Sequence, residues 1–201
     1  MCIITINREF GSGGRELAKR LADMLGFAYF DKEIISMVAK KSNLSEDYLE
    51  CVTTKNNEFP YTIGKSFTLY SAPQKYFTNM LVTERKIIQE IAKQGNCVIV
   101  GRGADVILRE FNTVNIFVYS NLNSKLKRCK EKASANENLN EKELIKKIKL
   151  VDKQRKKFYL LLGLDSWGEK ENYDICINTT NVEIKDVVPQ LAELTKRYLG
   201  E

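Results

Sequence analysis

Three glycines near the N-terminus carry the clearest chemical signal in this chain. Gly11, Gly13 and Gly14 follow a β-branched run, Cys2–Ile6, and a segment of helical period begins directly behind them at Arg15. Glycines allow a backbone to close tightly around an anion, and the first amides of a helix point toward one. The succession of strand, glycine loop and helix therefore predicts a phosphate-binding loop.

The loop departs from the usual phosphate-binding pattern GxxxxGK[ST]. In that register Glu9 replaces the first glycine, and Arg15 and Glu16 replace the lysine and the hydroxyl residue. We expect Arg15 to supply positive charge to a phosphate oxygen and the Glu16 carboxylate to be the ligand of Mg²⁺. The alternative is a tight turn that closes the strand and helix without binding anything.

A second glycine cluster, Gly101-Arg102-Gly103, follows the apolar run Cys97–Val100, and Asp105 lies two residues further on. In open parallel sheets, ligands bind beyond the carboxyl ends of the strands. Arg102 is therefore placed to meet an anion. A turn between strand and helix that carries a solvated arginine is the alternative.

Short β-branched runs alternate with longer stretches of helical period, which predicts a three-layer α/β fold around a parallel sheet. Apolar residues recur at helical spacing between the runs, and these stripes are expected to pack on the sheet. Met24 and Tyr198 belong to such stripes and are expected in the core. The candidate strands are Cys2–Ile6, Phe27–Phe30, Cys97–Val100, Val114–Tyr119 and Tyr173–Asn178.

Two segments interrupt this alternation. Thr53–Lys75 contains two of the three prolines and many polar residues, so we expect a functional or mobile insertion there. Residues 133–138 divide two helical stretches. Asn140 and Glu143 then form a capping-box pattern that predicts a helix reaching to about Leu162.

Composition narrows the chemistry. The 201 residues are 43% apolar and include no histidine. This apolar fraction predicts one sizeable core, and we expect residues 1–201 to form a single domain. The absence of imidazole excludes Ser-His-Asp and Cys-His catalysis, HExxH metalloprotease chemistry and mixed Cys/His zinc sites. Carboxylates, lysines, arginines and backbone amides must carry the chemistry.

The cysteines indicate a reducing environment, because they are odd in number, far apart and contain no CxxC pair. We expect them to be small buried side chains in a cytoplasmic protein. No apolar run approaches 18 residues and the N-terminal stretch lacks a signal-peptide pattern, so neither export nor a membrane partner is expected. The five are Cys2, Cys51, Cys97, Cys129 and Cys176.

The formal charge of +6 indicates an anionic ligand, and it is unevenly distributed. The segment from Lys125 to Lys157 holds 13 Lys and Arg against 5 Asp and Glu, whereas the remainder holds 19 against 21. This favours a local field for a polyphosphate over a general affinity for nucleic acid. No RNA-binding aromatic pattern, helix-turn-helix spacing or zinc finger supports a nucleic-acid partner.

Several stretches together resemble the cytidylate kinase-like branch of the P-loop nucleoside monophosphate kinases, in order and spacing, over nearly the whole chain. The resemblance implies an α/β/α fold with a five-stranded parallel sheet and a helical lid. It also implies phosphoryl transfer from ATP to a nucleoside monophosphate with Mg²⁺. The stretches are INREFGSGGRELAKRLA, YFDKEII, VIVGRGADVIL, NIFVYS with KLKRCKE, VDKQRKKFY and YDICINTTNVEIKDVV.

The resemblance also implies roles for single residues. Arg102 matches the arginine that grips the acceptor's phosphate, and Arg128 matches an arginine of the lid, here residues 121–160. Asp152 and Arg155 match an Asp-x-x-Arg pair that contacts the base and phosphate region of CMP; an exposed ion pair on one helix is the alternative. The residues matched to the ATP phosphate loop are Gly11, Ser12, Gly13, Gly14 and Arg15, with Glu16 beside them.

Two departures concern the acceptor. Met37 stands where cytidylate kinases carry a phosphate-binding arginine, and Lys32 is the cation that could compensate for it as a point charge. Gly103 stands where the family has an aspartate after its arginine, and the nearest acid is Asp105. The ATP side of the site therefore matches the family more closely than the acceptor side.

Phosphoryl transfer requires positioning and charge neutralisation, so it needs no imidazole base. We expect Arg15, Arg102, Arg128 and Arg155, with Mg²⁺, to surround the transferred group, and CMP or dCMP to be the acceptor. One alternative is a small-molecule kinase with a non-nucleotide acceptor held by Thr53–Lys75. Another is a non-catalytic nucleotide sensor, since the usual lysine and hydroxyl are absent.

Overall fold

The computed structural model describes residues 2–42, 71–132, 140–164 and 166–200. The chain divides into two compact units. One comprises residues 1–31 and 95–201 and contains the sheet and both glycine clusters. The other comprises residues 32–94.

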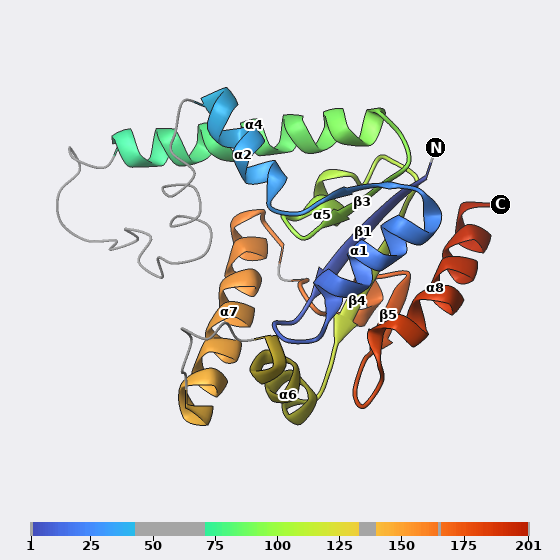
Figure 1. Ribbon diagram of the computed structural model, residues 1–201. Coiled ribbons are helices and arrows are strands. Elements are labelled where there is room, and N and C mark those ends of the chain that lie inside the picture. The colour runs from blue at the N-terminus through green and yellow to red at the C-terminus, as the bar shows by residue number, and fades with distance from the viewer. Residues whose placement is uncertain (1, 43–70, 133–139, 165, 201) are drawn as a thin grey trace. The chain divides into compact units, whose positions relative to one another are not determined.

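A five-stranded parallel sheet forms the centre of the first unit (Figure 1), as predicted. Its order is β2-β3-β1-β4-β5, so β1 lies in the middle with β3 and β4 beside it. Because all neighbouring pairs are parallel, the loops after β1 and β3 leave the same edge of the sheet side by side. The strands are β1 Ile3–Arg8, β2 Ala28–Phe30, β3 Cys97–Val100, β4 Thr113–Tyr119 and β5 Ile175–Asn178.

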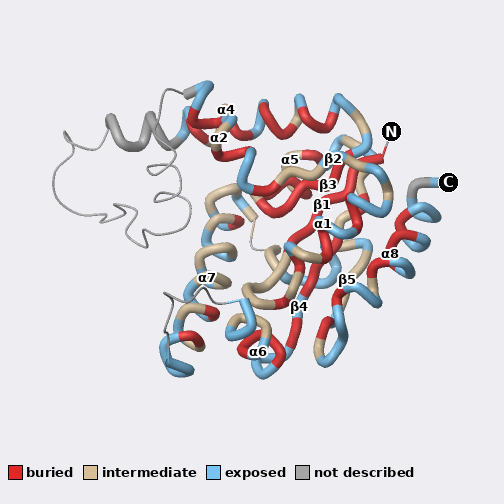
Figure 2. Tube along the Cα trace, in the orientation of Figure 1, coloured by how far each residue is buried: buried red, intermediate tan, exposed pale blue. Residues whose placement is uncertain are grey.

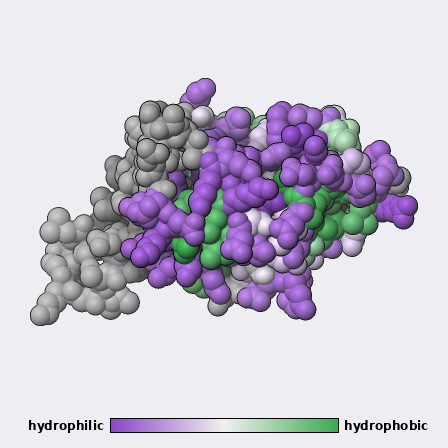
Figure 3. Space-filling view, turned by 60° about the horizontal axis from the view of Figure 1, so that its bottom comes forward, coloured by the Kyte–Doolittle hydropathy of each residue, from purple (hydrophilic) through white to green (hydrophobic). Residues whose placement is uncertain are grey.

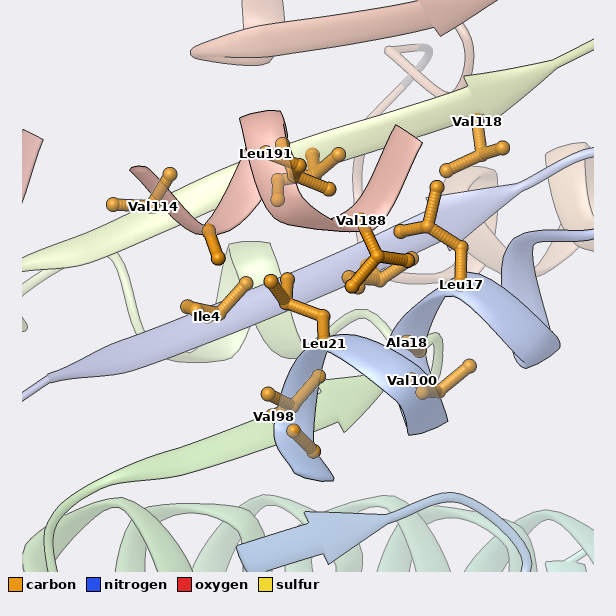
Figure 4. Close-up of a cluster of buried hydrophobic side chains, with 14 of the residues drawn as sticks. Ile4, Leu17, Ala18, Leu21, Val98, Val100, Val114, Val118, Val188 and Leu191 are labelled. Carbon is orange, nitrogen blue, oxygen red and sulfur yellow. The ribbon is translucent and has the colours of Figure 1, made fainter. Parts of the chain in front are cut away.

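Helices α1 (Gly14–Leu25) and α8 (Ile184–Leu199) pack on one face of this sheet. Figure 4 shows Leu21 of α1 and Leu191 of α8 among the apolar side chains of β1, β3 and β4, and Figure 2 shows these strands as buried. The β-branched residues of the strands fill the space between sheet and helices. Because α1 begins where the glycine loop ends, the packing of α1 on the sheet also fixes the position of that loop.

On the opposite face, β1 contacts helices that follow β3 and β4, namely α5 and α7. Asn7 of β1 points to that side and contacts Tyr159 of the long helix α7. The capping box predicted from Asn140 and Glu143 is present at the start of α7, so this prediction is confirmed. The helices between β3 and β5 are α5 Ala104–Ile107, α6 Leu122–Lys132, α7 Glu141–Leu161 and the short η2 Lys170–Asn172.

The second unit contains α2 (Glu33–Ser42) and α4 (Ser71–Lys93), which pack against each other. An ion pair of 2.6 Å joins Lys41 to Glu90 across them. Residues 53–70 of the insertion expected at Thr53–Lys75 lie outside the described residues, and 71–75 belong to α4.

The expectation that Met24 and Tyr198 belong to the core is wrong, because they are 53% and 50% exposed. Both lie in the last turn of their helices, and at the end of α1 it is the next residue, Leu25, that packs against the core. Cys2 and Cys97 are buried as expected, but Cys176 is exposed because it faces outward from the edge strand β5.

No helix in the described part of the chain is both long and apolar enough to cross a lipid bilayer. On the face that Figure 3 presents, hydrophilic side chains prevail and leave smaller hydrophobic areas between them.

Truncating a buried residue of α1 should lower the stability of the protein more than truncating an exposed residue of the same helix. We expect Leu21→Ala to lower the free energy of unfolding by about 2–5 kcal/mol, because it leaves a cavity under the sheet. Met24→Ala, the matched control, should change it by less than about 0.5 kcal/mol. Urea unfolding measures both, and equal losses would contradict this packing.

Candidate functional site

The glycine loop is shaped to leave backbone amides open. Gly11 and Gly13 have φ of 76° and 84°, in the left-handed region that glycine adopts without strain. Helix α1 begins at Gly14, and no side chain caps its first turn. Since the first amides of a helix have no partner within it, those of α1 remain available to an anion beyond the end of β1.

Ion pairs and hydrogen bonds hold the glycine loop to helices α6 and α7. The carboxylate of Glu9 lies 2.8 Å from the ammonium of buried Lys125 on α6, and it accepts a hydrogen bond of 3.0 Å from the amide of Ser120. Lys125 also lies 3.4 Å from Asp152 of α7, whose carboxylate accepts a hydrogen bond of 2.7 Å from the amide of Phe10. Glu9, which replaces the usual first glycine, therefore anchors the loop to both helices.

Asp152 and Arg155 share one side of α7, as their spacing predicted, and both contact the loop. Arg155 donates a hydrogen bond of 2.7 Å to the carbonyl of Arg8 and pairs with Asp152 at 3.3 Å. Burial raises the pKa of Asp152 and lowers the pKa of Arg155. The pair is thus not an exposed helical ion pair, since its contacts hold the start of the glycine loop.

The two residues that replace the lysine and hydroxyl of the usual pattern are engaged within the protein. Arg15 is 57% exposed in its side chain, and its Nε lies 2.5 Å from Asp31 at the end of β2. Glu16 accepts from Arg20 at 3.0 Å and from Lys132 at 2.5 Å, and the Lys132 hydrogen bond lowers its pKa. Glu16 would have to release a cation to hold Mg²⁺.

A pocket of about 600 Å³ lies over the loop. The loop glycines, Arg15 and Glu16 line it from below, while α6 and α7 contribute mainly basic side chains. The strongly basic segment of the sequence therefore surrounds the open amides. The cationic residues of the lining are Arg8, Arg15, Lys19, Arg128, Lys130, Lys132, Lys147 and Arg155.

Arg128 lines this pocket and also ties α6 to the loop between β5 and α8. Its guanidinium donates to the carbonyls of Thr179 and Val182, at 2.5 and 2.9 Å, and to the hydroxyl of Ser120 at 3.4 Å. The segment 121–160, expected as a lid, consists of α6 and α7 with residues 133–139 outside the described part. Both helices are bonded to the glycine loop or its neighbours.

Arg102 occupies a strained backbone position in the second glycine cluster. Its φ is 60°, and it lies between Gly101 and Gly103 with φ of 72° and 63°. A left-handed arginine is uncommon, and strain of this kind concentrates at functional sites. The turn follows β3, which neighbours β1, so Arg102 and the glycine loop emerge from adjacent strands.

Asp105 is buried under this turn and bonded to the interior. Tyr159 of α7 donates to its carboxylate, and Asn7 of β1 donates to the Tyr159 hydroxyl at 2.6 Å. Burial raises the pKa of Asp105. These contacts make Asp105 part of the support of the turn. Lys32, the other residue expected at the acceptor, is exposed and begins the second unit.

Two cations of the pocket, Arg8 and the exposed Lys19, were not expected from the sequence, and of these Arg8 is the more buried one. It is the last residue of β1, its side chain is 14% exposed, and its guanidinium lies 3.6 Å from Asp31. Its place at the carboxyl end of the central strand, directly before the loop, was the signal that could have revealed it.

The comparisons with known proteins agree with this geometry. The family model described as "Cytidylate kinase-like family" matches residues 3–181. The chain belongs to this family. A relative named cytidylate kinase from Thermosipho melanesiensis is 28% identical to this family member, over 97% of each chain.

Solved structures show the fold of this cytidylate kinase-like chain. It is similar to an uncharacterized protein from Eubacterium ventriosum, with a TM-score of 0.70 and 26% identity over 98% of this chain and 99% of the other. It also resembles shikimate kinase from Bacteroides thetaiotaomicron, with a TM-score of 0.57 and 17% identity over 97% and 98% of the two chains. The five-stranded parallel sheet is therefore that of a P-loop kinase, as expected.

The raised pKa of Asp105 predicts a pH dependence. A carboxyl whose folded pKa exceeds its usual 3.8 stabilises the fold fully below that value and loses this contribution as the pH rises through the folded pKa. The stability of the wild type relative to Asp105→Asn should therefore fall as the pH rises above 3.8 and through the raised pKa of Asp105. Urea unfolding at several pH values tests this, and a constant difference would contradict it.

Proposed function

We propose that this protein transfers a phosphoryl group from ATP to a nucleoside monophosphate, with CMP or dCMP as the acceptor. The observation that carries the proposal is the uncapped start of α1 behind Gly11 and Gly13, opening into a pocket lined by basic side chains. Membership of the cytidylate kinase-like family and the name of the Thermosipho relative support the choice of reaction and acceptor.

The loop suits the phosphates of ATP. The amides of the first turn of α1 face a pocket of about 600 Å³, and the glycines leave no side chain between them and the pocket. The glycines are also needed for packing, because a Cβ on Gly13 would lie 2.6 Å from Cδ1 of Ile184. A loop of this shape is held by the protein itself and does not depend on the ligand.

Glu16 is the side chain we assign to Mg²⁺. In the described residues no three acidic, cysteine or histidine side chains form a group that could enclose a metal ion. Mg²⁺ is commonly held by one or two carboxylates together with nucleotide phosphates, so a single carboxylate at the loop suits a metal carried with ATP. When bound, Mg²⁺ would neutralise charge on the phosphates.

Arginine side chains supply the other charge neutralisation and positioning that the reaction needs. Arg15 at the start of α1 and Arg155 on α7 both line the pocket and can neutralise charge on the group in transfer. Arg128 holds the β5–α8 loop against α6. In the proposed acceptor site, Arg102 binds the acceptor's phosphate. Asp152 and Arg155 contact the start of the glycine loop and so fix its position relative to the acceptor.

A nucleotide sensor without catalysis is the second candidate, and one observation favours it. Arg15 and Glu16 stand at the positions of the usual lysine and hydroxyl, and both are paired with charged side chains of the protein. A sensor would bind ATP through the loop amides and transfer nothing.

A coupled assay of ADP release across nucleoside monophosphates tests the proposal. We expect Mg²⁺-dependent ADP formation that requires an acceptor and is fastest with CMP or dCMP. ATP binding in calorimetry together with the absence of turnover for every acceptor would contradict catalysis and support the sensor. Turnover with a non-nucleotide acceptor alone would contradict the choice of acceptor.

Two variants control this assay against contaminating kinases. Arg102→Ala should lower kcat/KM for the acceptor by about 10²–10³-fold, because a bound phosphate loses a charged partner. Arg109→Ala, which removes an exposed arginine a few residues away, should leave kcat/KM unchanged. An unaltered kcat/KM in Arg102→Ala would remove this residue from the site.

A further inference from the structure

The side chain of Arg8 joins the two glycine clusters. Its stem lies against Gly14, where an added Cβ would come within 2.5 Å of the Arg8 Cβ. Its head lies against Gly101, where an added Cβ would overlap Nη1. Gly14 leaves room for the stem of Arg8. Gly101, whose φ of 72° itself favours glycine, leaves room for its head, so one arginine extends from the phosphate loop to the turn after β3.

The surroundings of Arg8 carry an excess of positive charge. Burial and the charges of Arg155, Arg15 and Arg102 together lower the pKa of Arg8 to about 9, although Asp31 opposes them. The guanidinium still carries its charge at neutral pH. The charges of three other arginines thus act on Arg8, while Asp31 lies beside Arg8 and Arg15 and Asp152 pairs with Arg155. This excess of positive charge favours the arrival of an anion.

Asp31 compensates Arg8 incompletely. The distance from Arg8 Nη2 to Asp31 Oδ1 is 3.6 Å, which exceeds hydrogen-bonding distance, whereas Arg15 Nε lies 2.5 Å from the other oxygen. The carboxylate is 8% exposed and is shared by two guanidinium groups. A phosphate dianion offers more charge and more acceptor oxygens than this carboxylate, so it can serve both arginines better.

We propose that Arg8 binds the phosphate monoester of the acceptor and that Asp31 is a stand-in anion, holding Arg8 and Arg15 in place until that phosphate arrives. Arg8 is then a binding residue and Asp31 a positioning residue. This rests on the proposed function, of which it specifies the acceptor subsite, and it supplies a guanidinium that Met37 cannot.

The direction of the Arg8 side chain selects the acceptor rather than ATP. From the central strand β1, its head points to the ends of β3 and β2, where Gly101 and Asp31 lie. Arg128 and the loop after β5 lie on the other side of β1, beyond β4. An anion bound by the head of Arg8 would therefore lie between the glycine loop and the Arg102 turn.

Binding of inorganic phosphate, measured by calorimetry and by thermal shift, tests the site without assuming any kinase activity. Arg8→Met keeps a stem of similar length against Gly14 and should weaken phosphate binding about 10²-fold, and Arg8→Lys should recover part of it. Asp31→Asn should bind phosphate several-fold more tightly than the wild type. Glu193→Gln, which removes an exposed negative charge on α8, should match the wild type.

These outcomes distinguish phosphate binding by Arg8 and the stand-in role of Asp31 from purely structural roles. A structural role for Asp31 would weaken phosphate binding in Asp31→Asn, and that result would overturn the stand-in. Unchanged binding in a folded Arg8→Met, or absence of phosphate binding by the wild type at tens of millimolar, would overturn the site. Should Arg8→Met fail to fold, equal phosphate affinity in Arg8→Lys and wild type would overturn it, since lysine lacks the guanidinium fork.

A kinetic arm assigns the phosphate to the acceptor. With an acceptor that the wild type phosphorylates, Arg8→Met should raise the acceptor KM by about 10²-fold and leave the ATP KM within a few-fold. A change confined to the ATP KM would overturn the assignment. If the wild type phosphorylates no acceptor, the proposed function fails, while the phosphate-binding result still decides whether Arg8 and Asp31 form an anion site.

Discussion

The buried ammonium of Lys125 holds the geometry of this site together. It lies between Glu9 of the glycine loop and Asp152 of α7, and Asp152 in turn accepts the amide of Phe10. A buried charge is tolerated only where partners of opposite sign surround it, so neither carboxylate nor the ammonium can move without exposing the others. The loop therefore keeps its shape although its first glycine is replaced by glutamate.

The distribution of charge around the glycine loop also explains why the pocket suits an anion. On the inner side of the loop, Lys125 and Arg155 pair with the carboxylates of Glu9 and Asp152. On the pocket side, Arg8 and Arg15 share the one carboxylate of Asp31, so positive charge prevails. The strained turn at Arg102 follows the neighbouring strand. An anion placed there would relieve repulsion that the folded chain otherwise sustains.

The fold and the loop could be predicted from the sequence because both depend on local patterns. Alternating β-branched runs located the strands, and Asn140 with Glu143 located the start of α7. The partners of Arg15, Glu16 and Arg128 could not be predicted, since they lie on other elements. Arg8 was missed because its surroundings include Gly14 and Gly101 on other elements. Met24 was misplaced because apolar spacing alone does not show that its neighbour Leu25 is the residue that packs against the core.

The central claim is that polyphosphate binds at the open amides of the glycine loop. Amide chemical shifts, followed by NMR during titration with ADP and Mg²⁺, test it most directly. We expect the largest changes at Gly11, Gly13, Gly14 and Arg15, while amides of α8 beyond its first turn stay unchanged. Saturable ADP binding without changes at these loop amides, or no ADP binding at all, would contradict it.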